Sequence, residues 1–156
     1  MFWNTVLGKL IMTFGISMLP VLELRGAIPV GVASGLEYKL VLLVSVIGNL
    51  VPVPFIIIFI RKIFKWARKK SESLNSLVTK FETRAAKKAA TVIKYEFWGL
   101  VILVAIPLPG TGAWTGALVA AMLDMRLKNA LPAIALGVVI AGLIVTFVTY
   151  GATILI

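Results

Sequence analysis

The length of the uncharged apolar runs most constrains how this chain can fold. Residues 40–60 and 129–156 contain no charged side chain and are mostly apolar. A helix needs about 20 consecutive apolar residues to cross the hydrocarbon core of a bilayer. Each of these two runs therefore predicts a transmembrane helix.

The composition agrees with a membrane environment. Hydrophobic residues make up 60% of the 156 residues and charged residues 14%, against about 45–50% and 25% in soluble domains. A soluble chain of this size still exposes much of its surface to water, which such a composition would not tolerate. The composition therefore excludes a soluble enzyme or nucleic-acid-binding domain and predicts an all-α integral membrane protein.

A third apolar run, residues 97–123, is interrupted by Pro-Leu-Pro-Gly-Thr-Gly at 107–112. Proline removes a backbone donor, and the residue before a proline disfavours the α conformation. We therefore expect two half-length helices, 97–106 and 113–123, on either side of a break.

The N-terminal part shows a similar pattern. Short apolar stretches at 10–22 and 30–36 flank Glu-Leu-Arg-Gly-Ala-Ile-Pro at 23–29, which we interpret as a second break. The sequence leaves open whether residues 5–22 form a half-span or a full transmembrane helix.

Positive charge is concentrated between the two predicted spans. Eleven of the sixteen basic residues lie between Arg61 and Lys94, opposed by Glu72 and Glu82. By the positive-inside rule this segment, 61–95, is expected to be cytoplasmic and the protein to lie in the inner membrane. Apolar residues recur there every three or four positions, which predicts an amphipathic helix at 65–95. It could lie on the anionic leaflet, pack over the protein or form a solvated connector.

The two halves of the chain resemble each other when shifted by 87 residues. Residues 36–40 (Leu-Glu-Tyr-Lys-Leu) then align with residues 123–127 (Leu-Asp-Met-Arg-Leu). The pattern predicts one membrane domain, 1–156, with repeat 1 at 5–64, the amphipathic helix at 65–95 and repeat 2 at 96–156. Counting crossings gives the halves opposite topologies, an arrangement typical of transporters, although chance similarity of apolar segments stays open.

Glu23 and Arg25 are the principal candidate functional residues. A charged side chain at membrane depth is costly and usually functional, and each is the other's candidate partner. A buried Glu23 could carry a proton, and Arg25 could hold an anionic head group. The alternatives are a structural ion pair or an ordinary interfacial loop.

Other candidate residues come from the apolar spans and the second break. Asn49 lies within the span 40–60, where it could bind substrate or join helices. The remaining candidates for substrate or proton binding are Pro109, Gly110, Thr111, Gly112, Trp114 and Thr115. The chain has no Cys or His and no two acidic residues within four positions, so we expect no catalytic site, metal site or cofactor.

Two segments resemble the signatures of a known family: Glu-Leu-Arg-Gly-Ala-Ile-Pro-Val-Gly at 23–31 and Pro-Leu-Pro-Gly-Thr-Gly-Ala-Trp-Thr-Gly at 107–116. They resemble those of the small multidrug export proteins, which are remotely similar to the DedA superfamily. The resemblance implies an inner-membrane protein with two re-entrant hairpins facing each other. For DedA relatives it implies polyprenyl phosphate recycling and coupling to the proton gradient. The arginines of the DedA pattern near Pro109-Gly110 are missing here, which counts against phosphate binding at the second hairpin.

These observations favour a transporter, a small multidrug exporter working by alternating access, in which protonation of Glu23 breaks its bond to Arg25. A flippase or scramblase for polyprenyl phosphate or another anionic lipid is the alternative. A non-transporting scaffold that recruits a partner through the basic helix is a third. We expect membrane lipid and a small molecule or lipid as partners, no nucleic acid, and a homo-oligomer, a dimer.

Overall fold

A computed structural model describes residues 2–155, and every regular element within that range is a helix, as the sequence predicts. The elements are η1 (Phe2–Asn4), α1 (Val6–Met18), α2 (Glu23–Ala33), α3 (Tyr38–Leu50), α4 (Pro52–Lys70), α5 (Glu72–Ala105), α6 (Ala113–Met122) and α7 (Leu127–Leu155). The terminal residues 1 and 156 of the predicted domain bounds lie outside the described range.

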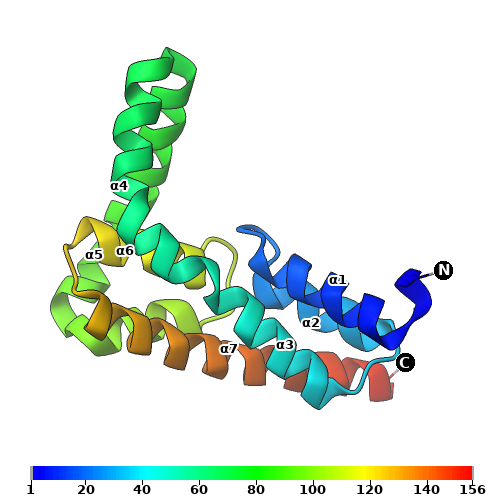
Figure 1. The fold of residues 1–156 in the computed structure, drawn as a ribbon. Coiled ribbons are helices and arrows are strands. Elements are labelled where there is room, and N and C mark those ends of the chain that lie inside the picture. The colour runs from blue at the N-terminus through cyan, green and yellow to red at the C-terminus, as the bar shows by residue number, and fades with distance from the viewer. Residues whose placement is uncertain (1, 156) are drawn as a thin grey trace.

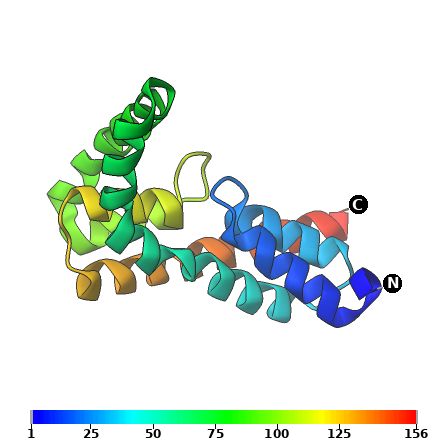
Figure 2. The same cartoon turned by 45° about the horizontal axis from the view of Figure 1, so that its top comes forward.

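Two helical hairpins face each other across the middle of the molecule. The first joins α1 to α2 through residues 19–22, and the second joins the last part of α5 to α6 through residues 106–112. The two connecting loops lie side by side, while the hairpins extend toward opposite ends (Figures 1 and 2). A helix of 13 residues, such as α1, is about 20 Å long, too short to cross a 30 Å hydrocarbon core.

The second hairpin confirms the predicted half-helices. The helix α5 changes direction at Glu96, where φ is 48°, and its last part ends at Ala105. The loop that follows contains the whole predicted break, and α6 occupies Ala113–Met122. Both half-helices end within one residue of the predicted positions.

The predicted break in the first hairpin was misplaced. Residues 23–29 form the first part of α2, and the chain turns instead at residues 19–22. Pro29 lies inside α2, where it removes one backbone hydrogen bond without ending the helix. Because α1 ends at Met18, residues 5–22 do not form one long helix.

Two helical stretches of residues 2–155 are long and apolar enough to cross a membrane: Tyr38–Lys70 and Leu127–Leu155. The first contains the span predicted at 40–60 and confirms that it is long and apolar enough to cross, although α3 and α4 meet with a bend just before Pro52 (Figure 1). The two stretches are antiparallel, since Tyr38 at the start of α3 lies against Tyr150 near the end of α7, with 5.6 Å between ring centroids.

The amphipathic helix predicted at 65–95 is interrupted once: residues 65–70 end α4, and residues 72–95 all belong to α5. We call residues 61–83 the arm: the last part of α4 and the first part of α5, which project together from the rest of the protein (Figure 1), whereas α5 packs in the core from Ala85 onward. The helices are separated at Ser71, whose backbone is extended and whose Oγ accepts a hydrogen bond from the Ser73 N–H at 3.3 Å. Ser71 caps α5, because a serine oxygen satisfies an otherwise unpaired N–H at a helix start.

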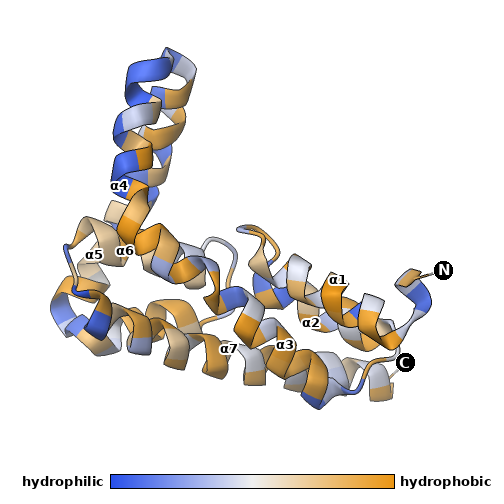
Figure 3. Cartoon of the chain, in the orientation of Figure 1, coloured by the Kyte–Doolittle hydropathy of each residue, from blue (hydrophilic) through white to orange (hydrophobic). Residues whose placement is uncertain are grey.

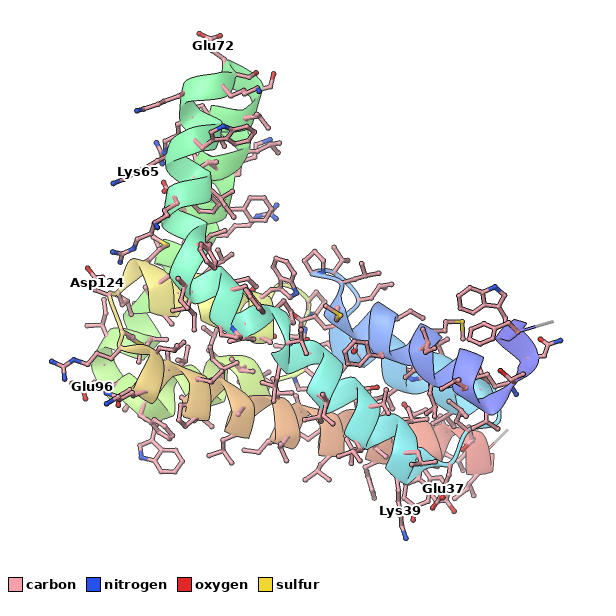
Figure 4. The ribbon with its side chains drawn as sticks, viewed as in Figure 1. Glu37, Lys39, Lys65, Glu72, Glu96 and Asp124 are labelled. Carbon is pink, nitrogen blue, oxygen red and sulfur yellow. The ribbon has the colours of Figure 1, made fainter. Side chains whose placement is uncertain are left out.

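Charged residues mark two ends of the molecule. Glu37 and Lys39 lie at one end, and Lys65, Glu96 and Asp124 lie at the other (Figure 4). Between these ends the helices are mostly hydrophobic (Figure 3). Large apolar side chains face outward there, such as the 81% exposed Phe147 of α7. Such a surface is unfavourable in water and normal in lipid.

Candidate functional site

The carboxylate of Glu23 is buried between the two hairpins. Glu23 is 3% exposed and begins α2 with a φ of 49°. Its Oε1 accepts a hydrogen bond from the Trp114 N–H at 3.1 Å. Trp114 is the second residue of α6, where the first N–H groups have no partner within the helix and carry a partial positive charge. The negative charge of the first hairpin thus lies at the start of the second hairpin's helix.

Arg25 also binds the second hairpin. Its guanidinium donates to the carbonyl oxygens of Leu108 and Ile106, the latter at 3.4 Å, and to Thr111 Oγ1 at 2.9 Å. Loop carbonyls in a membrane protein cannot be satisfied by lipid and need partners within the protein. Arg25 and the Thr111 hydroxyl together supply those partners for the Ile106 and Leu108 carbonyls.

The expected direct bond between Glu23 and Arg25 is not formed. Within residues 2–155, only Arg61–Asp124 and Arg68–Glu82 form ion pairs with an N–O distance under 4.0 Å. Residues two positions apart on a helix do not face each other, because successive side chains are about 100° apart around the axis. The two charges of α2 therefore bind separate groups of the opposite hairpin.

Gly112 and Trp114 hold the two hairpins close together. Gly112 has φ 115° and ψ −168°, a conformation found essentially only in glycine. A Cβ atom at this position would meet the Glu23 carboxylate. The Trp114 indole Nε1 donates to the Met18 carbonyl oxygen at 3.1 Å, so both its backbone and its side chain bind the first hairpin.

Asn49 of α3 lies beside the charged pair. It is 1% exposed and lines a narrow pocket together with Glu23, Arg25 and Gly112. Its side-chain oxygen and nitrogen have no hydrogen-bond partner in the described part of the chain. Buried polar groups are nearly always paired, so an unpaired amide at this depth distinguishes Asn49 from its apolar neighbours.

The remaining candidates line a groove of about 510 Å³ at the loops. Pro109, Gly110, Thr111, Trp114 and Thr115 contribute to it together with Arg25. The structure thus places all nine predicted residues in the pocket or the groove. Groove residues that the sequence did not single out are Pro20, Val21, Phe81, Arg84, Ala85, Pro107 and Leu118.

Arg84 is the most informative of these additions. In the sequence it is one of many basic residues between the spans, and no local signal distinguishes it. In the structure α5 returns from the arm past the loops, so that Arg84 and Arg25 line the same groove. Two guanidinium groups favour an anionic group in the groove.

Fold and site together define an α-helical membrane protein whose two hairpins meet at a buried centre of opposite charges. The chain belongs to the family described as "Putative small multi-drug export protein", whose model matches residues 23–144. The match includes both loop-flanking segments, α2 and α6, and confirms the resemblance seen in the sequence. No curated protein and no solved structure matches the chain, so the remoter similarity to DedA proteins stays a prediction.

Proposed function

We propose that this protein exports small molecules across the inner membrane by alternating access, with Glu23 as the proton-carrying residue. The observation that carries the proposal is the contact between the hairpins: Glu23 binds the start of α6, and Arg25 binds the loop before it. In this proposal the hairpins are re-entrant, and the contact between them is the gate.

An internal repeat supports this proposal, because the two hairpins end in the same turn. After α2 and after α6, three successive N–H groups bond to carbonyls in the same order. The pairs are Ser34–Val30 with Leu123–Val119, Gly35–Val32 with Asp124–Ala121, and Leu36–Gly31 with Met125–Ala120. Each equivalent pair is 89 residues apart, and so are the first residues of α3 and α7.

Close glycine contacts give the same relation between the halves. A Cβ on Gly48 would lie 2.8 Å from the Phe14 carbonyl oxygen, and one on Gly137 would lie 2.9 Å from that of Val101. The glycines are 89 residues apart, whereas Phe14 and Val101 are 87 apart. The offset of 87 taken from the sequence thus fits only the first helix of each half, and it rises to 89 after the loops, which are residues 19–22 in the first hairpin and 106–112 in the second.

The direction of the hairpins supports opposite topologies. The hairpins approach the centre from the two ends that carry the charged residues, and α3 and α7 are antiparallel (Figures 1 and 4). Inverted repeats with interrupted helices at mid-membrane are typical of transporters that work by alternating access. With the basic arm in the cytoplasm, the end that carries Glu37 and Lys39 faces outward.

Protonation of Glu23 would weaken the gate. A hydrogen bond to a charged group contributes about 1.5–3 kcal/mol, and a neutral one about 0.5–1.5 kcal/mol. Neutralising the carboxylate therefore weakens its hydrogen bond to the Trp114 N–H by about 1 kcal/mol. A change of this size shifts the equilibrium between a closed and an open gate about fivefold. In this mechanism the proton weakens the bond between Glu23 and Trp114, which joins the hairpins. It takes the place of the mechanism predicted from the sequence, in which protonation breaks a bond between Glu23 and Arg25.

Glu23→Gln tests the proposal, because the amide oxygen can still accept from the Trp114 N–H while the side chain carries no proton. We expect the variant to fold and to lose proton-driven efflux of ethidium from proteoliposomes. Glu37→Gln is the matched control, since Glu37 lies at one end of the protein, away from the gate (Figure 4), and should retain efflux. Undiminished gradient-driven efflux in Glu23→Gln would remove Glu23 from the mechanism.

The groove favours a second candidate function, the flipping of an anionic lipid. Arg25 and Arg84 both line it and could hold a lipid phosphate with paired hydrogen bonds. Headgroup movement of a fluorescent anionic lipid in vesicles, without ethidium flux, would favour the flippase. A scaffold that acts only through the arm predicts instead that function depends on residues 66–94 and tolerates alanine at Glu23 and Arg25.

A further inference from the structure

A second hollow, separate from the gate, lies where the arm meets α6. It has a volume of about 440 Å³, within the range of small-molecule sites in proteins. Its lining is divided between cationic and apolar side chains. The cationic residues are Arg61, Lys65 and Arg68, and the apolar ones include Ile60, Phe64, Leu118 and Met122.

The three cations lie on one face of α4, because they are spaced four and three residues apart. Arg61 forms a 2.7 Å ion pair with Asp124 and also donates to the Ala121 carbonyl oxygen, while Arg68 pairs with Glu82. In the described residues no carboxylate oxygen lies within 4.0 Å of the Lys65 ammonium. With the two carboxylates paired to these cations, Asp124 and Glu82, the three positive charges leave a net charge of +1, which is that of Lys65.

The position of the hollow suits the headgroup level of a membrane. Lys65 lies on the same side of the protein as Asp124 and Glu96, the charged end of the molecule (Figure 4). From that end α6 extends toward the centre of the protein (Figure 1). Leu118, one turn before Met122, therefore lies deeper than the cations.

We infer that this hollow binds one anionic phospholipid from the cytoplasmic leaflet. Lys65 and the exposed edges of Arg61 and Arg68 would hold the lipid phosphate, and Phe64, Leu118 and Met122 would contact the start of the acyl chains. Basic pockets between helices on the cytoplasmic side commonly hold lipid head groups. The bound lipid would join α4 to α6, and this inference does not depend on transport through the gate.

The test measures lipid binding to the purified full chain in a neutral detergent by native mass spectrometry. The added lipids are dioleoyl phosphatidylglycerol and, as the zwitterionic reference, dioleoyl phosphatidylcholine. We expect phosphatidylglycerol to bind preferentially and Lys65→Gln to weaken it about fivefold, the effect of one cation near an anionic membrane surface. Lys62→Gln removes the same charge from α4 outside the hollow and should leave the affinity within twofold of the wild type.

Three results would overturn the inference. Equal binding of the two lipids would show that the phosphate charge is not recognised. Equal losses in Lys65→Gln and Lys62→Gln would show attraction to the arm as a whole. Displacement of phosphatidylglycerol by an equal concentration of glycerol 3-phosphate would identify a site for free phosphate. Because Lys65 is exposed, we expect its substitution to leave folding intact, and circular dichroism of each variant verifies this.

Discussion

Gly112→Ala tests whether the close contact between the hairpins depends on a residue without a side chain. The backbone conformation of Gly112 is essentially restricted to glycine, and forcing alanine into it costs about 1–3 kcal/mol. The new Cβ would also displace the Glu23 carboxylate, whose bond to the Trp114 N–H contributes about 1.5–3 kcal/mol. We expect a total loss of about 3–5 kcal/mol in the free energy of unfolding.

Gly110→Ala is the matched control in the same loop. Gly110 also has a positive φ, 78°, but a Cβ there would meet no atom within 4 Å. Its substitution should cost only the backbone strain, about 1–2 kcal/mol. The two variants are compared by titrating the detergent-solubilised protein with dodecyl sulfate and following helix loss by circular dichroism. Equal losses in the two variants would show that Gly112 does not pack against the carboxylate and would refute the geometry of the gate.

Two further predictions concern contacts that hold the hairpins and helices together. Arg25→Lys keeps the charge but replaces a guanidinium with several bonds to loop 106–112 by a single ammonium, so we expect a loss of about 1–3 kcal/mol in the same titration. Arg126→Lys, in the turn before α7, is the control and should change the free energy of unfolding little. Equal losses in Arg25→Lys and Arg126→Lys would contradict the role of Arg25. Gly137→Ala would place a Cβ 2.9 Å from the Val101 carbonyl oxygen and should destabilise the α5–α7 contact by about 1–3 kcal/mol. Gly151→Ala, with no atom within 4 Å, should be neutral or slightly stabilising, and a neutral Gly137→Ala would show that these helices are not closely packed.

The two similar turns after α2 and α6 show how far pattern matching along the chain can go. Residues 36–40 and 123–127 have similar residue types at each position, and aligning them gives an offset of 87 residues. The turns with the same hydrogen bonds are nevertheless 89 residues apart. In that alignment Gly35, in the turn after α2, corresponds to Asp124, in the turn after α6, and both have the left-handed conformation. Glycine and aspartate both tolerate that conformation, so the equivalence lies in backbone geometry and not in residue type.

The sequence by itself determined the membrane class, the second loop and the distribution of charge. These features follow from local physics: apolar length sets what can lie in lipid, and the two closely spaced prolines of 107–112, followed by two glycines, interrupt a helix locally. The first loop was misplaced for the same reason. Its residues 19–22 are Leu-Pro-Val-Leu, which resemble the apolar helix before them except for one proline, whereas the conspicuous charges of Glu23 and Arg25 lie inside the next helix.

Only the tertiary structure decided what those charges bind. Glu23 and Arg25 are neighbours in sequence, which made them each other's candidate partners, but their helix directs them to separate groups. The partners, Trp114 and Leu108, are 91 and 83 residues away in the chain. Arg84 reaches the same groove only because α5 returns from the arm. Contacts at such separations depend on how the helices pack, and no local pattern encodes the packing of one hairpin against another.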